Sequence, residues 1–331
     1  MEPSSEPEDG RQQSRDAGVF TVLVALGANA LVATAKTVAA VLTGSASMVA
    51  ESAHSWADTG NEVFLLLAER RGGRPADPGH PGGHGRETYV WTMFAAVGLL
   101  VAGCALSIWH GVSELGADPE TGSFLVNWVV LAVAAVFETI SFVQAARQAR
   151  SRGKEHGVRP VRLVLATSDA TLRAVFLEDF AALVGLVLAA LGVGLHEVTG
   201  NPVWDALGSI AVGLLLGVVA MLLIVRNHDF LVGQTVPPGL WDGVLSRLLE
   251  HAEIERVTYL HVEYVGPMRF FVVAAVDLVG NEDEQSVAVR LRRLEADVEA
   301  YTPVADAVLT LSTPDEPSLA THAEAASALR H

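Results

Sequence analysis

The chain has 331 residues, of which 50% are hydrophobic and 18% are charged, and its formal net charge is −16. Its mean hydropathy is +0.36, which is too apolar for an ordinary soluble protein of this length. Most of the charge lies near the ends of the chain and after Val236, and the acidic balance argues against a nucleic-acid partner. The single cysteine, Cys104, lies in an apolar run, so there is no disulfide framework.

Six apolar stretches reach about 20 residues, the length that spans a bilayer. They are residues 18–42, 46–69, 89–114, 124–146, 170–195 and 204–226. Residues 1–17 are polar and lack the apolar core of a cleavable signal, so we expect a soluble tail there. Lys and Arg gather in the loops at 70–86 and 147–162, and short cytoplasmic loops carry the positive charge. Both termini are therefore expected in the cytoplasm.

After the sixth stretch, helical and strand-like patterns alternate. The spacing predicts a helix, two strands, a second helix and a last strand, at residues 241–251, 257–264, 269–277, 287–300 and 307–311. This order fits a small two-layer domain at 237–313, followed by a mobile tail at 314–331. The predicted fold class is an α-helical membrane protein, with a six-transmembrane-helix bundle at 18–230 and a C-terminal cytoplasmic α+β (ferredoxin-like) domain.

The second apolar stretch contains a polar stripe. His54 and Asp58 are four residues apart and share a helix face, and Glu51 and Glu62 extend the stripe. Ionisable groups at bilayer depth usually face a bundle interior or an aqueous cavity. An imidazole and a carboxylate one turn apart form half of a tetrahedral divalent-metal site. The alternative is an internal hydrogen bond between His54 and Asp58 without a metal.

The run SASMVAESAHSWADTGN at residues 45–61 is followed by RPADP at 74–78 and HGRE at 84–87. Together with the six stretches and the α+β domain, it resembles the cation diffusion facilitator family, in its zinc transporter 9-like branch, from about residue 18 to 313. The resemblance implies a transporter rather than an enzyme. It also implies that the family's HxxxD pair corresponds to His54 and Asp58, and that the α+β domain pairs two copies in a homodimer.

The fifth stretch departs from the family pattern, which usually places a second HxxxD there. Asp179, six residues before Gly185, matches the family aspartate, but Val175 occupies the histidine position. Glu178 is adjacent, although successive helix residues point about 100° apart. The resemblance thus gives His54, Asp58 and Asp179 as metal ligands, and leaves Glu178, Asn29 or water as the fourth. The alternative is that this span begins later, so that both carboxylates are interfacial.

Several other polar residues lie in or near the spans. The candidate accessory groups are Asn29, Glu51, Glu62 and Glu138. Lys36 either pairs with one of these carboxylates or extends toward the interface. Asp77, His80 and His84 lie on a Gly/Pro-rich loop that either collects metal at low affinity or is a solvated turn. We expect no metal site in the α+β domain, whose strands lack a histidine cluster.

The predicted function is a divalent-cation antiporter of the cell (inner or plasma) membrane, with Zn²⁺ as the first candidate. Metal ligation requires a neutral imidazole and ionised carboxylates, so protons compete with the metal and H⁺ is the expected counter-ion. One imidazole with carboxylates leaves Mn²⁺ or Fe²⁺ open as cargo. The rival hypotheses are a membrane metalloenzyme that uses the same site and a non-transporting scaffold. The expected partners are the bilayer and a second copy, with no resident cofactor.

Overall fold

The computed structural model describes residues 26–27, 29–116, 124–155, 164–301 and 303–322. The chain divides into two compact units. The first is Met1–Arg70 with Val90–Asn227, and the second is Arg71–Tyr89 with His228–His331. The loop with Asp77, His80 and His84 thus groups with the C-terminal unit. The predicted N-terminal tail, the start of the first span and the last nine residues of the predicted mobile tail lie outside the described residues.

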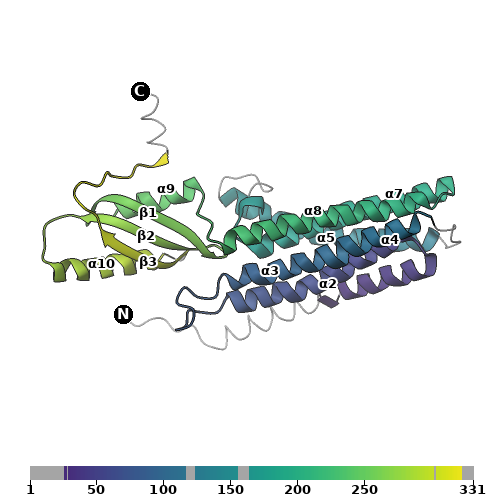
Figure 1. Ribbon diagram of the computed structural model, residues 1–331, viewed down its shortest axis with the longest axis horizontal. Helices are drawn as coiled ribbons and strands as arrows, with labels where there is room; N and C mark the ends of the chain where they lie inside the picture. Colours follow the sequence, from purple (N-terminus) through teal and green to yellow (C-terminus); the bar gives the residue numbers. More distant parts are fainter. Residues whose placement is uncertain (1–25, 28, 117–123, 156–163, 302, 323–331) are drawn as a thin grey trace, which may run out of the picture. The chain divides into compact units, whose positions relative to one another are not determined.

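The first unit is built from long helices (Figure 1). An apolar helix covers Asn29–Thr43. The third stretch is one helical run that consists of α3, a π-helical segment labelled η1, and α4. The remaining bounds are α2 Ala46–Gly72, α3 Glu87–Gly98, η1 Leu99–Ala105, α4 Leu106–Glu114, α5 Phe124–Glu155, α7 Ala170–Thr199 and α8 Val203–Leu231.

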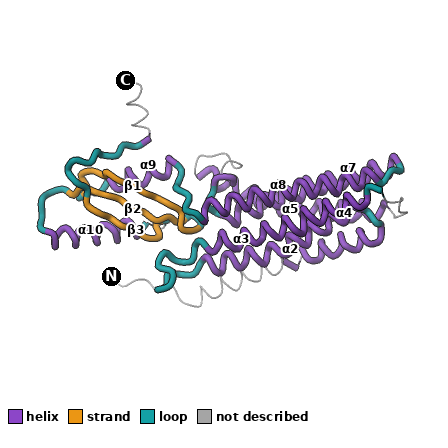
Figure 2. The backbone as a smooth tube through the Cα atoms, in the orientation of Figure 1, coloured by secondary structure: helices purple, strands orange, loops and turns teal. Residues whose placement is uncertain are grey.

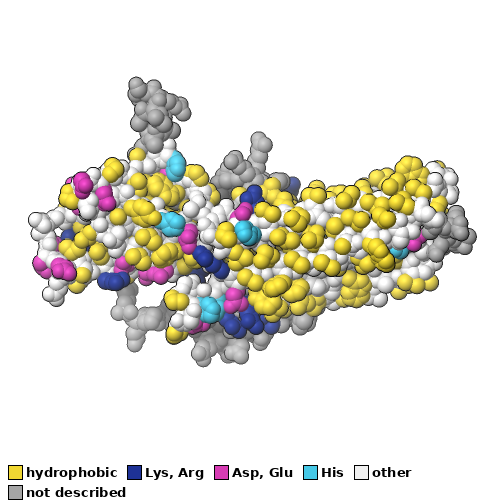
Figure 3. All heavy atoms as spheres, viewed as in Figure 1, with side chains coloured by type: hydrophobic (Ala, Val, Ile, Leu, Met, Phe, Trp, Pro, Cys, Tyr) yellow, Lys and Arg dark blue, Asp and Glu magenta, His cyan; other side chains and the backbone are white. Residues whose placement is uncertain are grey.

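Four described helical runs are long and apolar enough to cross a membrane: Glu87–Glu114, Phe124–Ser151, Ala170–Thr199 and Val203–Leu231. Their exposed side chains are largely hydrophobic, as lipid contact requires (Figure 3). The helix α2 is 27 residues long, but its polar stripe lowers its hydropathy. The helical membrane fold is therefore confirmed. The count of six spans stays a prediction.

Local sequence explains how α7 and α8 are placed. Asp169 caps the start of α7, where its carboxylate accepts a hydrogen bond from the Leu172 amide at 2.9 Å. The helix ends at Gly200, whose φ of 68° is the left-handed conformation that glycine tolerates. On α8, a Cβ at Gly213 would lie 2.7 Å from Ile108, so the missing side chain allows close helix packing.

The second unit contains the predicted α-β-β-α-β order, which is confirmed (Figure 2). The strands β1 and β2 pair antiparallel and β2 and β3 pair parallel, in the sheet order β1-β2-β3. The helix α9 contacts β1 and α10 contacts β3. Strand β1 extends beyond the predicted stretch at both ends and β2 ends one residue later than predicted, because the pairing runs from Ile254 with Leu278 to Gly266 with Arg269. The bounds are α9 Pro238–Leu249, β1 Ile254–Gly266, β2 Arg269–Leu278, α10 Glu284–Glu299 and β3 Val304–Leu311.

Candidate metal site

A cavity of about 90 Å³ lies within the helical unit, which is room for several water molecules or an ion. Its walls come from the helix Asn29–Thr43 and from α2, α5 and α7. Most of its lining is polar, although a bilayer surrounds a bundle of this kind. The lining residues are Asn29, Val32, Ser55, Asp58, Glu62, Leu65, Glu138, Ser141, Val175, Glu178 and Asp179.

His54 and Asp58 lie one turn apart on α2. The His54 side chain is fully buried, and its Nδ1 is 3.5 Å from Oδ1 of Asp58, which is longer than a good hydrogen bond. Among the described residues, neither ring nitrogen of His54 nor Oδ1 of Asp58 has a hydrogen-bond partner. Buried polar atoms are nearly always paired, so these atoms are free to bind a ligand. The structure therefore does not show the hydrogen bond of the metal-free alternative.

The two carboxylates of α7 reach the same cavity. Glu178 accepts a hydrogen bond from Nδ2 of Asn61 at 2.9 Å, and Asp179 accepts one from Oγ of Ser141 at 2.8 Å. Both line the cavity, although they are successive residues of one helix, because the glutamate side chain is longer. They lie more than two turns inside α7. Val175 also lines the cavity.

The accessory residues divide into two groups. Asn29 donates a hydrogen bond to Oε1 of Glu62 at 2.6 Å, and Oε2 of Glu62 has no hydrogen-bond partner among the described residues. Glu51 does not line the cavity; it pairs with Lys36. The Lys36 ammonium lies 3.0 Å from Oε2 of Glu51 and 3.9 Å from Oε1 of Glu138. Of the two alternatives for Lys36, the structure shows the ion pair.

The predicted ligands surround the cavity without meeting at one point. Among the described residues, no three of His54, Asp58, Glu178 and Asp179 bring their ligand atoms within 4.8 Å of one another. The His54 ring also lies outside the cavity lining. Imidazole and carboxylate ligands are nevertheless those that bind Zn²⁺, Mn²⁺ and Fe²⁺.

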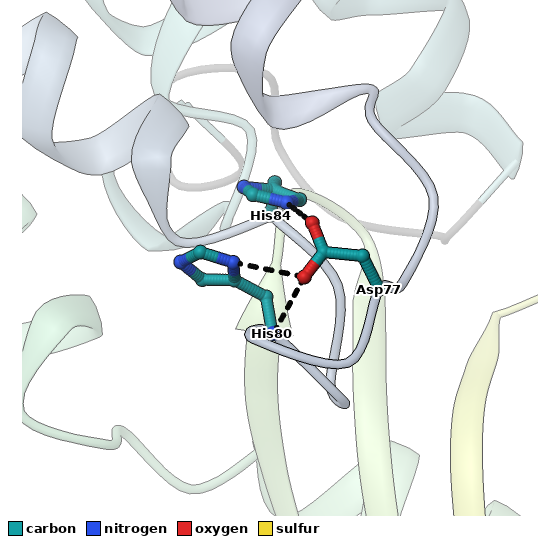
Figure 4. A group of neighbouring side chains, drawn as sticks. All are labelled: Asp77, His80 and His84. Carbon is teal, nitrogen blue, oxygen red and sulfur yellow. Dashed lines mark hydrogen bonds and ion pairs between the residues drawn. The ribbon is translucent and has the colours of Figure 1, made fainter.

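A second candidate metal position lies on the loop between α2 and α3. Single ligand atoms of Asp77, His80 and His84 all lie within 4.8 Å of one another. Figure 4 shows both imidazoles beside the Asp77 carboxylate, within one tight turn. The Asp77 carboxylate lies 2.9 Å from Nε2 of His84 and 3.2 Å from Nδ1 of His80. These three residues could hold a metal ion, and metal collection at this loop stays a prediction.

Hydrogen bonds shift the pKa values of Asp77 and His84 in this loop cluster. The hydrogen bond with His84 is the main reason that the pKa of Asp77 lies well below its usual range. The pKa of the buried His84 is raised, chiefly by its hydrogen bonds with Asp77 and then with Glu87. The Nδ1 atom of His84 lies 2.7 Å from Oε1 of Glu87. These hydrogen bonds join Asp77, His84 and Glu87 into one cluster.

Sequence reasoning did not identify the residues that orient the carboxylates. Asn61 holds Glu178, and Ser141 holds Asp179. Asn61 follows His54 by two helical turns and shares its face, a spacing that could have identified it. Ser141 follows Glu138 by three residues and shares its helix face, but the sequence does not show that this face meets Asp179.

The fold and the cavity define an integral membrane helix bundle with an ionisable interior. Residues 22–232 match the model of the cation efflux transmembrane domain. The chain belongs to the cation efflux family, also called the cation diffusion facilitators, as the motifs predicted. Members of this family are transporters and not enzymes, which agrees with the expectation for this chain.

Several curated proteins resemble the chain at the level of sequence. It is 38% identical over 231 residues to the proton-coupled zinc antiporter SLC30A9, mitochondrial, of Xenopus laevis. It is 35% identical over 234 residues to the protein of that name from Homo sapiens; each match covers 69% of this chain and 41% of the relative. Metal tolerance protein C4 of Arabidopsis thaliana is 31% identical over 248 residues, or 75% of this chain and 54% of the relative. The chain thus spans about two fifths to half of their length.

Proposed function

We propose that this chain exports a divalent metal cation from the cytoplasm in exchange for protons, with Zn²⁺ as the first cargo. The observation that carries the proposal is the set of buried atoms of His54 and Asp58 that have no hydrogen-bond partner among the described residues, beside a cavity lined by Glu178 and Asp179. The similarity to the SLC30A9 relatives, which are named as proton-coupled zinc antiporters, supports it.

The chemistry of the ligands supports exchange. A metal ion binds the neutral imidazole of His54 and the ionised carboxylates of Asp58 and Asp179, so binding releases protons. When the cavity faces the outer side, protonation of these groups expels the metal. When it faces the more alkaline cytoplasm, the protons leave. The proton gradient then drives export by alternating access.

The ligand set also bears on the choice of metal. Val175 lines the cavity where the family usually has histidine, so the proposed ligand set has several carboxylates of the cavity and one imidazole, that of His54 beside it. Carboxylate oxygens are harder ligands than imidazole nitrogens. Such a site therefore accepts Mn²⁺ or Fe²⁺ more readily than a site with two histidines does. We assign Glu178 as the fourth ligand or as a proton carrier, since its carboxylate lines the same cavity as that of Asp179. The cluster of Asp77, His80 and His84 provides a second position for the cation, outside the membrane-spanning segments.

The proposal includes a location and an assembly. We place the protein in the cell membrane with both termini in the cytoplasm, because Lys and Arg concentrate in two loops. The SLC30A9 relatives are named as mitochondrial, which makes a mitochondrial membrane the alternative. The α+β domain is proposed to pair two copies in a homodimer.

Flux measurements in proteoliposomes test the proposal. The wild-type chain is expected to take up Zn²⁺, to respond to an imposed pH gradient at clamped voltage and to change the signal of a trapped pH dye. Asp58→Ala is expected to give no uptake above protein-free vesicles. Glu69→Ala is the matched control, because this carboxylate lies on the same helix but is exposed and outside the cavity. Wild-type flux that ignores the pH gradient would exclude exchange, and normal flux in Asp58→Ala would exclude the site.

A further inference from the structure

A fully buried lysine lies beside the cavity of the helical unit. The side chains of Lys36 and Glu51 are both 0% exposed, and their charged atoms are 3.0 Å apart. Burying an ion pair is costly, and replacing it with apolar residues often leaves stability unchanged or improves it. Helix packing alone therefore does not require Lys36 at this position.

The contacts of Glu51 show how this ion pair is held. Its Oε2 faces Lys36, while its Oε1 has no hydrogen-bond partner among the described residues. A Cβ added at Gly185 on α7 would lie 2.8 Å from this Oε1. Glycine thus leaves room for the carboxylate, and Lys36 provides its counter-charge.

Glu138 connects the ion pair to the cavity. It lies 3.9 Å from the Lys36 ammonium and also lines the cavity with Asp58, Glu178 and Asp179. The described lining contains no Lys or Arg, so the nearby ammonium of Lys36 offsets the negative potential of these carboxylates. Charge interactions are strong at this depth because the surroundings screen them little.

We propose that Lys36 is a specificity-determining residue of the cation site: it neutralises Glu51, holds Glu138 away from the metal, and thereby sets how tightly the cavity binds a divalent ion. This inference rests on the proposed function. Without Lys36, the carboxylates of Glu51 and Glu138 add negative charge beside the cavity, and a metal ion binds more tightly. Without Glu51, the ammonium is less compensated and opposes metal binding.

A double-mutant cycle tests this role in proteoliposomes at fixed pH on both sides. The variants are Lys36→Met, Glu51→Gln and the combination, and the readouts are KM and kcat for Zn²⁺. Lys36→Met is expected to lower KM and Glu51→Gln to raise it, each by at least about tenfold for a full charge in a weakly screened site. The double variant restores the charge balance, so its KM is expected within about threefold of the wild-type value.

The opposite directions of the two shifts separate an electrostatic role from a structural one. A purely structural ion pair would reduce the amount of folded protein in both single variants and leave KM unmoved, or move it in the same direction. Either result would overturn the proposal. If Lys36→Met does not fold, a KM for Glu51→Gln that the double variant fails to lower again is equally contrary. Absence of flux in the wild-type chain would instead overturn the proposed function, so the two failures are distinguishable.

Discussion

Gly185→Ala tests whether Glu51 is packed against α7. The new Cβ would lie 2.8 Å from Oε1 of Glu51 and 3.8 Å from a methyl carbon of Val212. The carboxylate cannot withdraw freely, because its Oε2 is held 3.0 Å from the ammonium of Lys36. Overpacking of this kind costs about 1–3 kcal/mol. For a domain the size of the helical unit, each kcal/mol of lost stability lowers the melting temperature by roughly 2–4 °C. We therefore expect a decrease of about 2–12 °C.

Thermal unfolding of the purified chain in detergent, followed by tryptophan fluorescence, measures this change. Gly60→Ala on α2 is the matched control, because an added Cβ there meets nothing within 4 Å. Alanine is favoured over glycine inside a helix by about 0.5–1 kcal/mol, so the control is expected to melt at or above the wild-type temperature. If Gly185→Ala melts with the control, then Glu51 is not confined between Lys36 and α7, and the inference about Lys36 loses its structural basis.

Three further predictions concern the two candidate metal positions. Asp179→Asn is expected to eliminate metal flux, while Glu178→Gln reduces it or changes its pH dependence; the reverse pattern would show that the carboxylates exchange roles. Val175→His is expected to raise the ratio of Zn²⁺ to Mn²⁺ flux, because imidazole is the softer ligand; an unchanged ratio would exclude Val175 as a determinant of selectivity. The hydrogen bonds that lower the pKa of Asp77 stabilise the folded loop at pH values above the unfolded pKa of about 3.9. This contribution is lost as the pH falls toward the folded pKa. The hydrogen bonds that raise the pKa of His84 stabilise the folded loop at pH values below about 6.5. This contribution is lost as the pH rises through the folded pKa. Amide exchange of the loop, corrected for intrinsic rates, should therefore be slowest between these limits, and His84→Ala should remove the loss of protection at high pH.

The sequence alone was sufficient for features that depend on local spacing. Apolar length and period-two alternation predicted the membrane helices and the α-β-β-α-β order, because both patterns follow from the geometry of one element. The four-residue interval placed His54 and Asp58 on one face of α2. The family register gave Asp179, whose carboxylate lines the cavity.

Features that depend on the rotation of one helix against another were not predictable. The hydrogen bond from Ser141 to Asp179 joins α5 and α7, and nothing near either residue in the sequence indicates it. Lys36 had two interpretations until the structure paired it with Glu51. The Asp77 loop was ambiguous for another reason: its composition is that of a solvated turn, and only the three-dimensional turn brings the two imidazoles to one carboxylate.

The charge of the cavity supplies a reason for exchange under the proposed function. An empty cavity with Asp58, Glu178 and Asp179 all ionised would place three negative charges in surroundings that solvate them poorly. Lys36 offsets the charge of these three only in part, because its nearest carboxylate is Glu51. A divalent ion compensates the carboxylates on the outward step, and protons are the available replacement on the return. A cavity of this composition therefore favours antiport over passive release, and Glu178→Gln, the carboxylate variant expected to retain flux, should transport with fewer protons per metal ion.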